Sequence, residues 1–250
     1  MRFQDKVLVC TGAASGIGAA VARRFAADGG RVVLVDRNKA GLDHVAAEIG
    51  ATAIAVPVDV ASEEDVAAVV AAATDAFGTI DALYNGAAVL IAGEAMSASA
   101  ADLERHLSVN VVGTYLMCRA VGQAMKDRRG GAIVNTSSVV AFVARANRSL
   151  YAASKGAILP LTQHLALELA PHVRVNAVSP GPTLTGMTRE HYLKAAGTEA
   201  EALRIVGSQV LLNRVADPSE LAAAICFLLS DDASYVNGTL LTVDGGMTAE

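Results

Sequence analysis

The amino-acid sequence predicts an α/β fold, built as one parallel sheet with helices on both of its faces. Short apolar runs rich in β-branched residues alternate along the chain with longer, alanine-rich stretches of helical spacing, which is the pattern of repeated βα units. The apolar runs are nearly continuous, as in parallel strands buried on both sides. No linker, charge block or internal repeat interrupts them, so we expect residues 1–250 to form a single domain.

Seven of the apolar runs are predicted to be strands. In chain order they are Val7–Cys10, Arg31–Val35, Ala53–Val56, Ala82–Tyr84, Ala132–Asn135, Val173–Val178 and Thr239–Val243. The stretches between them carry apolar residues three and four positions apart and are predicted to be helices. These are Ile17–Ala27, Gly41–Ile49, Glu63–Phe77, Ala101–Lys126, Ala152–Leu169 and Pro218–Leu229.

Capping and helix-breaking residues refine these predictions. Ser62 and Asp217 precede acidic or proline-led first turns and are expected to cap their helices. Pro160 has no N–H, so it predicts a bend after Lys155 in the helix 152–169. From Ser179 to Gln209, glycines, prolines and polar residues interrupt any periodicity, and this irregular segment is predicted to be a mobile, substrate-binding lid.

Composition excludes several classes of protein. The 250 residues carry 20 basic and 25 acidic side chains, with 53% hydrophobic and 18% charged residues. A disordered chain and a basic nucleic-acid binder are therefore excluded. No apolar stretch is long enough to span a membrane, and the N-terminus lacks the layout of a secretory signal. The three cysteines are far apart and the histidines are not clustered, so we expect a cytoplasmic protein with no metal site.

A glycine-rich turn follows the first predicted strand and leads into the first helix. It contains Gly12, Ser15, Gly16, Ile17 and Gly18. Its glycines permit a close approach of the backbone to a pyrophosphate, which the helix N-terminus would hold. Such a turn alone is weak evidence, because ordinary strand-to-helix turns also contain glycine. Asp36, eighteen positions after the last glycine, strengthens the prediction of a dinucleotide site.

The residues around Asp36 bear on the choice of cofactor. A carboxylate at the end of the second strand can accept hydrogen bonds from both adenosine ribose hydroxyls and would repel a 2′-phosphate. We therefore expect NAD rather than NADP. Arg37 could serve a phosphate, although a solvated surface charge is the simpler interpretation. Asp59 and Val60 follow the third strand, where Asp59 either faces the adenine or caps a helix.

Tyr151 and Lys155 form the predicted catalytic pair. They are four residues apart on a predicted helix, so both side chains lie on one face. The ordinary pKa of tyrosine, about 10, is too high for a base near neutral pH. A nearby ammonium and a positive nicotinamide ring stabilise the phenolate. An isolated Tyr-x-x-x-Lys pair is usually an ordinary surface pair, but the glycine turn and Asp36 favour catalysis here.

The spacing Gly-x-x-x-Gly-x-Gly, with Asn85–Ala88, Ser138, Tyr151–Lys155 and Pro180–Gly181, resembles the short-chain dehydrogenase/reductase superfamily from Lys6 to Gly246. The resemblance implies a doubly wound, Rossmann-like domain with a seven-stranded sheet. It also implies that Tyr151 is the general acid/base and that Lys155 holds the nicotinamide ribose. Ser138 would bind the reacting oxygen, with Ser137 as the alternative. Asn110 would position a water that links Lys155 to solvent.

The cofactor residues follow from the glycine turn, Asp36 and this resemblance together. They are Gly12, Ser15, Gly16, Ile17, Gly18, Asp36, Arg37, Asp59, Val60, Asn85, Gly86, Ala87, Tyr151, Lys155, Pro180, Gly181, Thr183 and Thr185. Thr185 would hold the nicotinamide carboxamide, with the Thr183 backbone as a second anchor. The chain departs from the family pattern at 85–88, where Asn-Gly-Ala-Ala replaces Asn-Asn-Ala-Gly, and at 139–150, which lacks the usual glycines.

Arg148 and His191 are the predicted substrate residues beside Ser138. An Asn-Arg pair just before the tyrosine resembles family members that act on hydroxy acids or sugar acids, because a guanidinium binds a carboxylate bidentately. A structural or subunit contact is the alternative for Arg148. Alanine-rich faces on the helices 101–126 and 152–169 resemble the family's tetramer surfaces, which implies a homotetramer.

The sequence thus favours an NAD-dependent dehydrogenase acting on a secondary hydroxyl of a small polar compound: a hydroxy acid, sugar, polyol or sugar acid. An NADPH-dependent 3-oxoacyl-thioester or other carbonyl reductase is the alternative enzyme. A catalytically silent dinucleotide-binding sensor is the alternative outside catalysis. A sensor needs no general base, so the set Asn110, Ser138, Tyr151 and Lys155 counts against it.

Overall fold

A seven-stranded parallel sheet forms the centre of the molecule. The computed structural model describes residues 1–186 and 198–249. The strands are β1 (Val7–Thr11), β2 (Arg31–Asp36), β3 (Ala53–Pro57), β4 (Ala82–Asn85), β5 (Gly131–Thr136), β6 (Val173–Pro180) and β7 (Leu240–Val243). Their order in the sheet is β3-β2-β1-β4-β5-β6-β7. The predicted doubly wound fold is therefore confirmed.

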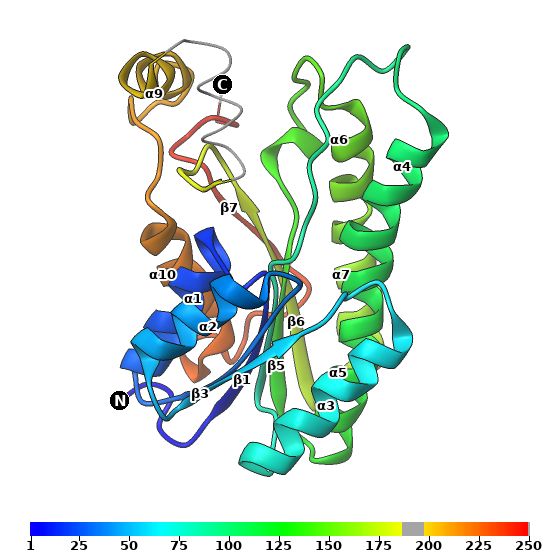
Figure 1. Ribbon diagram of the computed structural model, residues 1–250, viewed down its shortest axis with the longest axis vertical. Coiled ribbons are helices and arrows are strands. Elements are labelled where there is room, and N and C mark those ends of the chain that lie inside the picture. Colours follow the sequence, from blue (N-terminus) through cyan, green and yellow to red (C-terminus); the bar gives the residue numbers. More distant parts are fainter. Residues whose placement is uncertain (187–197, 250) are drawn as a thin grey trace.

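Helices cover both faces of this sheet (Figure 1). On one face lie α1 (Gly16–Ala27), α2 (Lys39–Ile49) and α10 (Pro218–Leu229). The other face is covered by α3 (Glu63–Phe77), α5 (Thr114–Asp127) and α7 (Ile158–Leu169). Successive strand residues point to opposite faces, so Leu8 and Cys10 enter one core while Val7 and Val9 enter the other. Burial on both faces accounts for the continuous apolar runs.

Two predicted helix caps are confirmed by their hydrogen bonds. The Ser62 hydroxyl accepts from the Asp65 N–H at 3.2 Å. Asp217 forms a capping box with Glu220 and is followed by Pro218 at the start of α10. Helix α2 begins before the predicted Gly41, because the Asn38 side chain caps it and accepts from the Gly41 N–H at 3.1 Å.

Two predicted helices differ from the structure in their continuity. The predicted helix 101–126 consists of α4 (Ala100–Leu107), a π-helical turn η1 (Ser108–Gly113) and α5. The predicted helix 152–169 is divided at Ala157 into α6 (Ser149–Gly156) and α7. Pro160 has no N–H with which to bond the Gly156 carbonyl, and the chain breaks where the bend was predicted.

The prediction of an irregular segment from Ser179 to Gln209 is partly wrong. The segment includes the end of β6 and the helix α9 (Glu199–Gly207). Thr198 caps α9 by accepting from the Glu201 N–H at 3.3 Å, a capping signal that the interrupted periodicity concealed. Helices α6 and α9 stand on opposite sides of the carboxyl ends of the strands (Figure 1). Within the described ranges, none of the helices is long and apolar enough to cross a membrane.

Candidate active site

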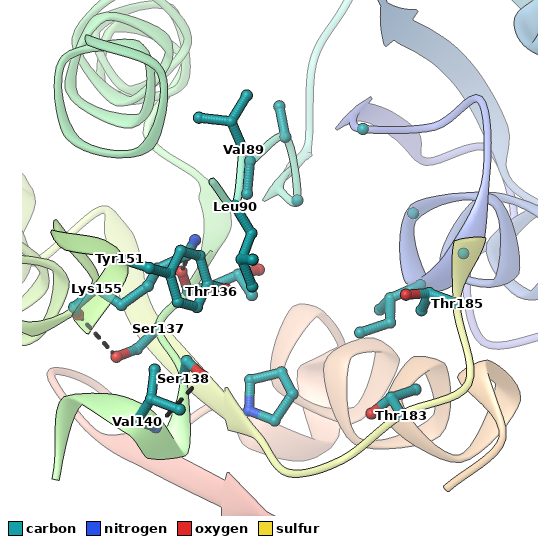
Figure 2. A pocket seen from close by; sticks show the side chains of 18 of the residues that line it. Val89, Leu90, Thr136, Ser137, Ser138, Val140, Tyr151, Lys155, Thr183 and Thr185 are labelled. Carbon is teal, nitrogen blue, oxygen red and sulfur yellow. Dashed lines mark hydrogen bonds between the residues drawn. The ribbon is translucent and has the colours of Figure 1, made fainter. Parts of the chain in front are cut away.

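A cavity of about 560 Å³ lies at the carboxyl ends of the strands. Its wall is built by the segments that directly follow β1 to β6, together with α6 and α9. Strands β1 and β4 are neighbours although β2 and β3 lie between them in the chain. Ligands of open α/β sheets bind at such a switch in strand order. Figure 2 shows the end of this cavity that Ser138, Tyr151 and Lys155 line.

Most of the predicted site residues line this cavity. They are Gly12, Ser15, Gly16, Ile17, Gly18, Asp36, Arg37, Asp59, Val60, Gly86, Ala87, Ser137, Ser138, Arg148, Tyr151, Lys155, Pro180, Gly181, Thr183 and Thr185. Asn85 and Asn110 are buried next to it without contributing to the wall. His191 lies outside the described residues.

The glycine-rich turn has the shape that a pyrophosphate requires. Gly12 has φ 70°, and a Cβ there would lie 2.7 Å from the carbonyl carbon of Gly86. A Cβ on Gly18 would lie 2.2 Å from the Gly12 oxygen, so only glycine allows the first turn of α1 to pack on the loop. The Ser15 side chain makes no capping bond and no acidic residue occupies the first turn. The free N–H groups of this helix end therefore fit an anion.

Asp36 is held at the far end of the cavity by backbone groups. Its carboxylate accepts from the Ala14 N–H at 3.3 Å and from the Asn38 N–H at 3.0 Å. The neighbouring Arg37 guanidinium lies 3.8 Å from the Asp59 carboxylate, which is also 3.9 Å from Arg105. Asp59 also accepts from the Ala61 N–H, while Ser62 is the residue that caps α3. This end of the cavity thus carries two carboxylates, one of them paired with arginines.

Asn85 lies behind the cavity wall, where its side chain makes buried hydrogen bonds. Its amide donates to the Asn135 side-chain oxygen at 2.9 Å and to the Cys118 sulfur at 3.2 Å. The next two residues, Gly86 and Ala87, donate their N–H groups to the Thr11 hydroxyl, both at 3.1 Å. These bonds tie the end of β4 to β5 and β1. They place the backbone of residues 86 and 87 against the glycine turn.

Within Asn-Gly-Ala-Ala at 85–88, the glycine at position 86 fits its close neighbours. A Cβ on Gly86 would lie 2.5 Å from the Tyr84 ring and 2.8 Å from the Thr11 carbonyl oxygen. Tyr84 is buried, and its hydroxyl accepts from the Thr136 hydroxyl at 3.1 Å. The tyrosine therefore fills the space that a side chain at position 86 would need.

Tyr151 and Lys155 meet on one face of α6, as their spacing predicts. The Lys155 Nζ lies 5.9 Å from the centroid of the Tyr151 ring. The lysine side chain is 1% exposed, and its Nζ donates to the Thr136 carbonyl at 2.8 Å. Burial disfavours the ammonium and lowers the pKa of Lys155 to about 7. The group can therefore both hold and release a proton near neutral pH.

The two serines at the end of β5 differ in what their hydroxyls do. The Ser137 hydroxyl is buried and donates to the Lys155 carbonyl at 2.9 Å. The Ser138 side chain is partly exposed, and its contact with the backbone is a long one, accepting from the Val140 N–H at 3.4 Å. Figure 2 shows the two side chains with these contacts. Ser138 therefore has hydrogen-bonding capacity left for a ligand, as the sequence favoured.

Asn110 lies in the π-helical turn and is completely buried. Its amide accepts from the Val89 N–H at 2.8 Å and donates to the Val89 carbonyl at 3.0 Å. It also donates to the Ser154 hydroxyl at 2.9 Å, which in turn donates to the Tyr151 carbonyl at 2.7 Å. Both amide hydrogens are used in these bonds. The side chain connects the loop after β4 with α6, which carries Tyr151 and Lys155.

Four residues of the site were missed by sequence reasoning: Tyr84, His106, Thr136 and Ser154. Ser154 lies inside the Tyr-x-x-x-Lys motif, and His106 precedes Asn110 by one helical turn. Helical spacing alone could have placed both beside the motif residues. The contacts of Tyr84 and Thr136 join neighbouring strands of the sheet, which local sequence does not reveal.

The part of the cavity wall around α6 and α9 mixes arginines with apolar side chains. Arg145 and Arg148 line it, and the Arg148 guanidinium donates to the Asn147 carbonyl at 3.3 Å. The apolar lining residues are Val89, Leu90, Val139, Val140, Ala202, Ile205, Val206 and Met247. Three of these belong to α9, so the mis-predicted segment contributes a helical wall. The described residues contain no cluster of His, Cys, Asp or Glu that could hold a metal ion.

Comparison with known proteins finds relatives along the whole chain. A family model described as enoyl-(acyl carrier protein) reductase matches residues 12–248. D-threitol dehydrogenase of Mycolicibacterium smegmatis is 40% identical, over 99% of this chain and 94% of that protein. Meso-2,3-butanediol dehydrogenase of Serratia marcescens is 38% identical, over 100% and 97%. The crystal structure of levodione reductase is 34% identical with a TM-score of 0.94, covering 99% of both chains.

Proposed function

Because this chain belongs to the short-chain dehydrogenase/reductase superfamily, we propose that it transfers hydride between NAD and a secondary alcohol or ketone of a small polar compound. The observation that carries the proposal is the arrangement of Ser138, Tyr151 and Lys155 around one end of a cavity whose other end carries the glycine turn and Asp36. The relatives named for threitol and butanediol support a polyol or diol as the first substrates to test.

Each residue has a defined part in the oxidative direction. The Tyr151 phenolate takes the proton of the substrate hydroxyl, and the Ser138 hydroxyl donates to the oxygen as charge develops on it. Lys155, with its pKa lowered to about 7, stabilises the phenolate when protonated and passes the proton on. The glycine turn, the Asp36 carboxylate and the Thr183–Thr185 segment would hold the dinucleotide. When bound, NAD supplies the hydride acceptor.

Asp36 supports NAD rather than NADP. Its carboxylate lines the cavity at the end of β2, where it would accept from ribose hydroxyls and repel a phosphate. Arg37, the residue best placed to attract a phosphate, lies 3.8 Å from the Asp59 carboxylate. That contact reduces the attraction that Arg37 offers to a second anion.

The test of this function is the initial rate of NADH formation with NAD, at mildly alkaline pH. Hydroxy acids and sugar acids are compared with their neutral polyol and sugar counterparts. Turnover that depends on NAD, and that Tyr151→Phe lowers at least about a thousandfold, supports the proposal. If turnover persists in Tyr151→Phe, the catalytic assignment is wrong. Cofactor binding without turnover of any substrate would instead support the silent sensor.

A second enzymatic candidate is the reduction of a 3-oxoacyl thioester or another carbonyl with NADPH. The description of the matching family model as an acyl carrier protein reductase favours it. Comparing NADH with NADPH on an acetoacetyl thioester separates the two candidates. NADPH-dependent reduction faster than any alcohol oxidation would replace the first proposal by this one.

Arg148 is proposed to bind an acidic group of the substrate. Its side chain lines the cavity three residues before Tyr151, and a guanidinium recognises a carboxylate bidentately. Arg148→Ala should raise the KM of an acidic substrate and leave the KM of its neutral counterpart unchanged. An unchanged KM for the acid would make Arg148 a structural residue. His191 is proposed as a further substrate contact, to be tested in the same way by His191→Ala.

We also propose a cytoplasmic homotetramer. Exposed apolar side chains on the outer helices, including Val112, Tyr115, Leu167 and Phe227, support association between copies of the chain. All three cysteines are free and buried, which suits a reducing compartment. Light scattering after size-exclusion chromatography tests the assembly, and a mass of one chain would overturn it.

A further inference from the structure

The loop that follows β4 borders the substrate part of the cavity without belonging to a helix or strand. Between Asn85 and the start of α4 the backbone is irregular, yet Val89 and Leu90 line the cavity with Tyr151 (Figure 2). A loop without strand pairing must be fixed by other bonds if it is to present a defined wall.

Two side chains one helical turn apart supply these bonds. The Asn110 side chain accepts from the Val89 N–H at 2.8 Å and donates to the Val89 carbonyl at 3.0 Å. His106 accepts the N–H of Ile91 through its Nε2 at 3.1 Å. Leu90 lies between these two anchored residues. Further along, the Gly93 N–H donates to the Asn147 carbonyl at 3.3 Å.

The surroundings of His106 fix its tautomer. The ring is completely buried, and its Nδ1 lies 2.7 Å from the Asp102 carbonyl oxygen. A carbonyl only accepts, so Nδ1 carries the hydrogen and the unprotonated Nε2 is the acceptor for Ile91. The same ring lies edge-on to Tyr151, with centroids 6.2 Å apart and an interplanar angle of 61°. His106 therefore contacts the loop and also packs against the ring of the predicted general base.

We propose that His106 is a positioning residue that holds Leu90 in the cavity wall beside Tyr151. His106 and Leu90 together determine which alcohols fit into this part of the cavity. The proposal deepens the proposed function and rests on it. Leu90 and Val140 are both apolar lining residues of this part of the cavity. The wall that His106 holds selects for a small or apolar substituent next to the reacting carbon.

Matched substitutions of His106 separate the acceptor from mere filling of space. His106→Gln keeps an acceptor near the position of Nε2, whereas His106→Asn keeps only a donor near Nδ1, and His106→Leu keeps neither. We expect His106→Asn and His106→Leu to raise the KM of the alcohol about tenfold, the effect of losing one buried hydrogen bond. We expect His106→Gln to stay within about twofold, and the NADH dissociation constant to be unchanged in all three. If Gln and Asn behave alike, the proposal is overturned.

A double-mutant cycle tests whether His106 acts through Leu90. Leu90→Ala should alter the ranking of alcohols of increasing substituent size, and His106→Leu should alter it in the same direction. If the histidine works by holding Leu90, the double variant should be little worse than Leu90→Ala alone. Independent effects, whose fold-changes multiply, would overturn the proposal.

Hydrogen exchange gives a measure that does not depend on the substrate. The amides of residues 88–92 should exchange about tenfold faster in His106→Leu than in the parent protein, and at the parental rate in His106→Gln. Parental exchange in His106→Leu would show that the imidazole does not fix the loop and would overturn the inference. If the exchange result holds but the parent oxidises no alcohol, the positioning stands and the proposed function fails.

Discussion

Lys155 is a buried, titratable side chain in the wall of the candidate site. It is 1% exposed, donates to the Thr136 carbonyl at 2.8 Å and lies 5.9 Å from the Tyr151 ring centroid. Its pKa is lowered to about 7 by burial, because leaving water disfavours the ammonium. Near neutral pH the site therefore contains a proton donor and acceptor that a solvated lysine would not provide.

The lowered pKa of Lys155 predicts a specific dependence of stability on pH. Between pH 7 and about 10.5 the unfolded chain binds a proton at this lysine that the folded chain has released, so this residue's contribution to stability rises with pH. Below pH 7 the folded protein bears the cost of the buried ammonium. Without cofactor, the parent should therefore gain stability over Lys155→Met as the pH rises from 7 to about 10.5. We expect the unfolding free energy of Lys155→Met minus that of the parent to fall by up to about 1.4 kcal/mol per pH unit. Urea unfolding at several pH values measures it, and a difference constant with pH would contradict the shift.

The negative charge of Asp36 is expected to determine the preference between NAD and NADP. Asp36→Asn removes the negative charge but keeps the size of the side chain, so the ratio of kcat/KM for NADP to that for NAD should rise at least about tenfold. Initial rates with both cofactors give the ratio. Asp43→Asn is the control, because Asp43 is exposed on α2 and pairs with Lys39. An unchanged ratio in Asp36→Asn would show that Asp36 does not read the ribose.

Sequence reasoning predicted the placement of Tyr151 and Lys155 better than the hydrogen-bond partners of the other candidate residues. The spacing of Tyr151 and Lys155 is local, so helical geometry alone predicted their shared face. The sequence favoured Ser138 and kept Ser137 as the alternative, because the difference between them depends on which hydroxyl donates to the Lys155 carbonyl. Asn85 and Asn110 were placed in the site, but their side chains bond to Asn135, Val89 and Ser154. Such long-range partners have no periodic signal in the sequence.

At the scale of elements, the irregularities of the helices coincide with the site. The π-helical turn Ser108–Gly113 carries Asn110, and the break at Ala157 follows directly on α6, which carries the predicted catalytic pair. Single π-helical turns inside α-helices are frequent at functional sites. Apolar periodicity predicted one long helix in each case, because it reports which face is buried and not the hydrogen bonds that the backbone makes. Proline is the exception, since its missing N–H is visible in the sequence.

The junction after β4 predicts a coupling between two neighbouring positions. Gly86→Ala should destabilise the protein by about 1–3 kcal/mol, because the new Cβ meets the Tyr84 ring and the Thr11 carbonyl oxygen. Adding Tyr84→Val should recover part of that loss relative to Tyr84→Val alone, since only the backbone contact then remains. Chemical denaturation measures the four variants of this cycle. Gly93→Ala is the control in the same loop, where a Cβ would meet nothing within 4 Å; equal losses at 86 and 93 would contradict the steric explanation.

At the scale of the whole molecule, one cavity joins residues from almost the full length of the chain. Its wall runs from Gly12 to Met247, so a bound dinucleotide would connect both halves of the sheet. Anything that binds only the folded state stabilises it. We expect NADH at about a hundred times its dissociation constant to add about 2.7 kcal/mol. For a chain of this size that raises Tm by roughly 5–10 °C.

Thermal unfolding with each cofactor measures this effect. NADPH at the same concentration should raise Tm less than NADH, by the difference in affinity that Asp36 produces. Equal shifts with the two cofactors would contradict the expected preference, and no shift with either would contradict a dinucleotide site. The comparison requires no knowledge of the substrate.

Two consecutive portions of the chain supply different parts of the cavity wall. Strands β1 to β3 and their connections supply the glycine turn, Asp36 and Asp59, while the chain beyond β4 supplies Leu90, Ser138, Tyr151, Lys155 and α9. Evolution or an engineer could therefore recombine the two portions at Asn85. A hybrid that keeps residues 1–85 and takes the remainder from a relative would therefore test whether the proposed choice of alcohol follows the second portion while the proposed preference for NAD follows Asp36.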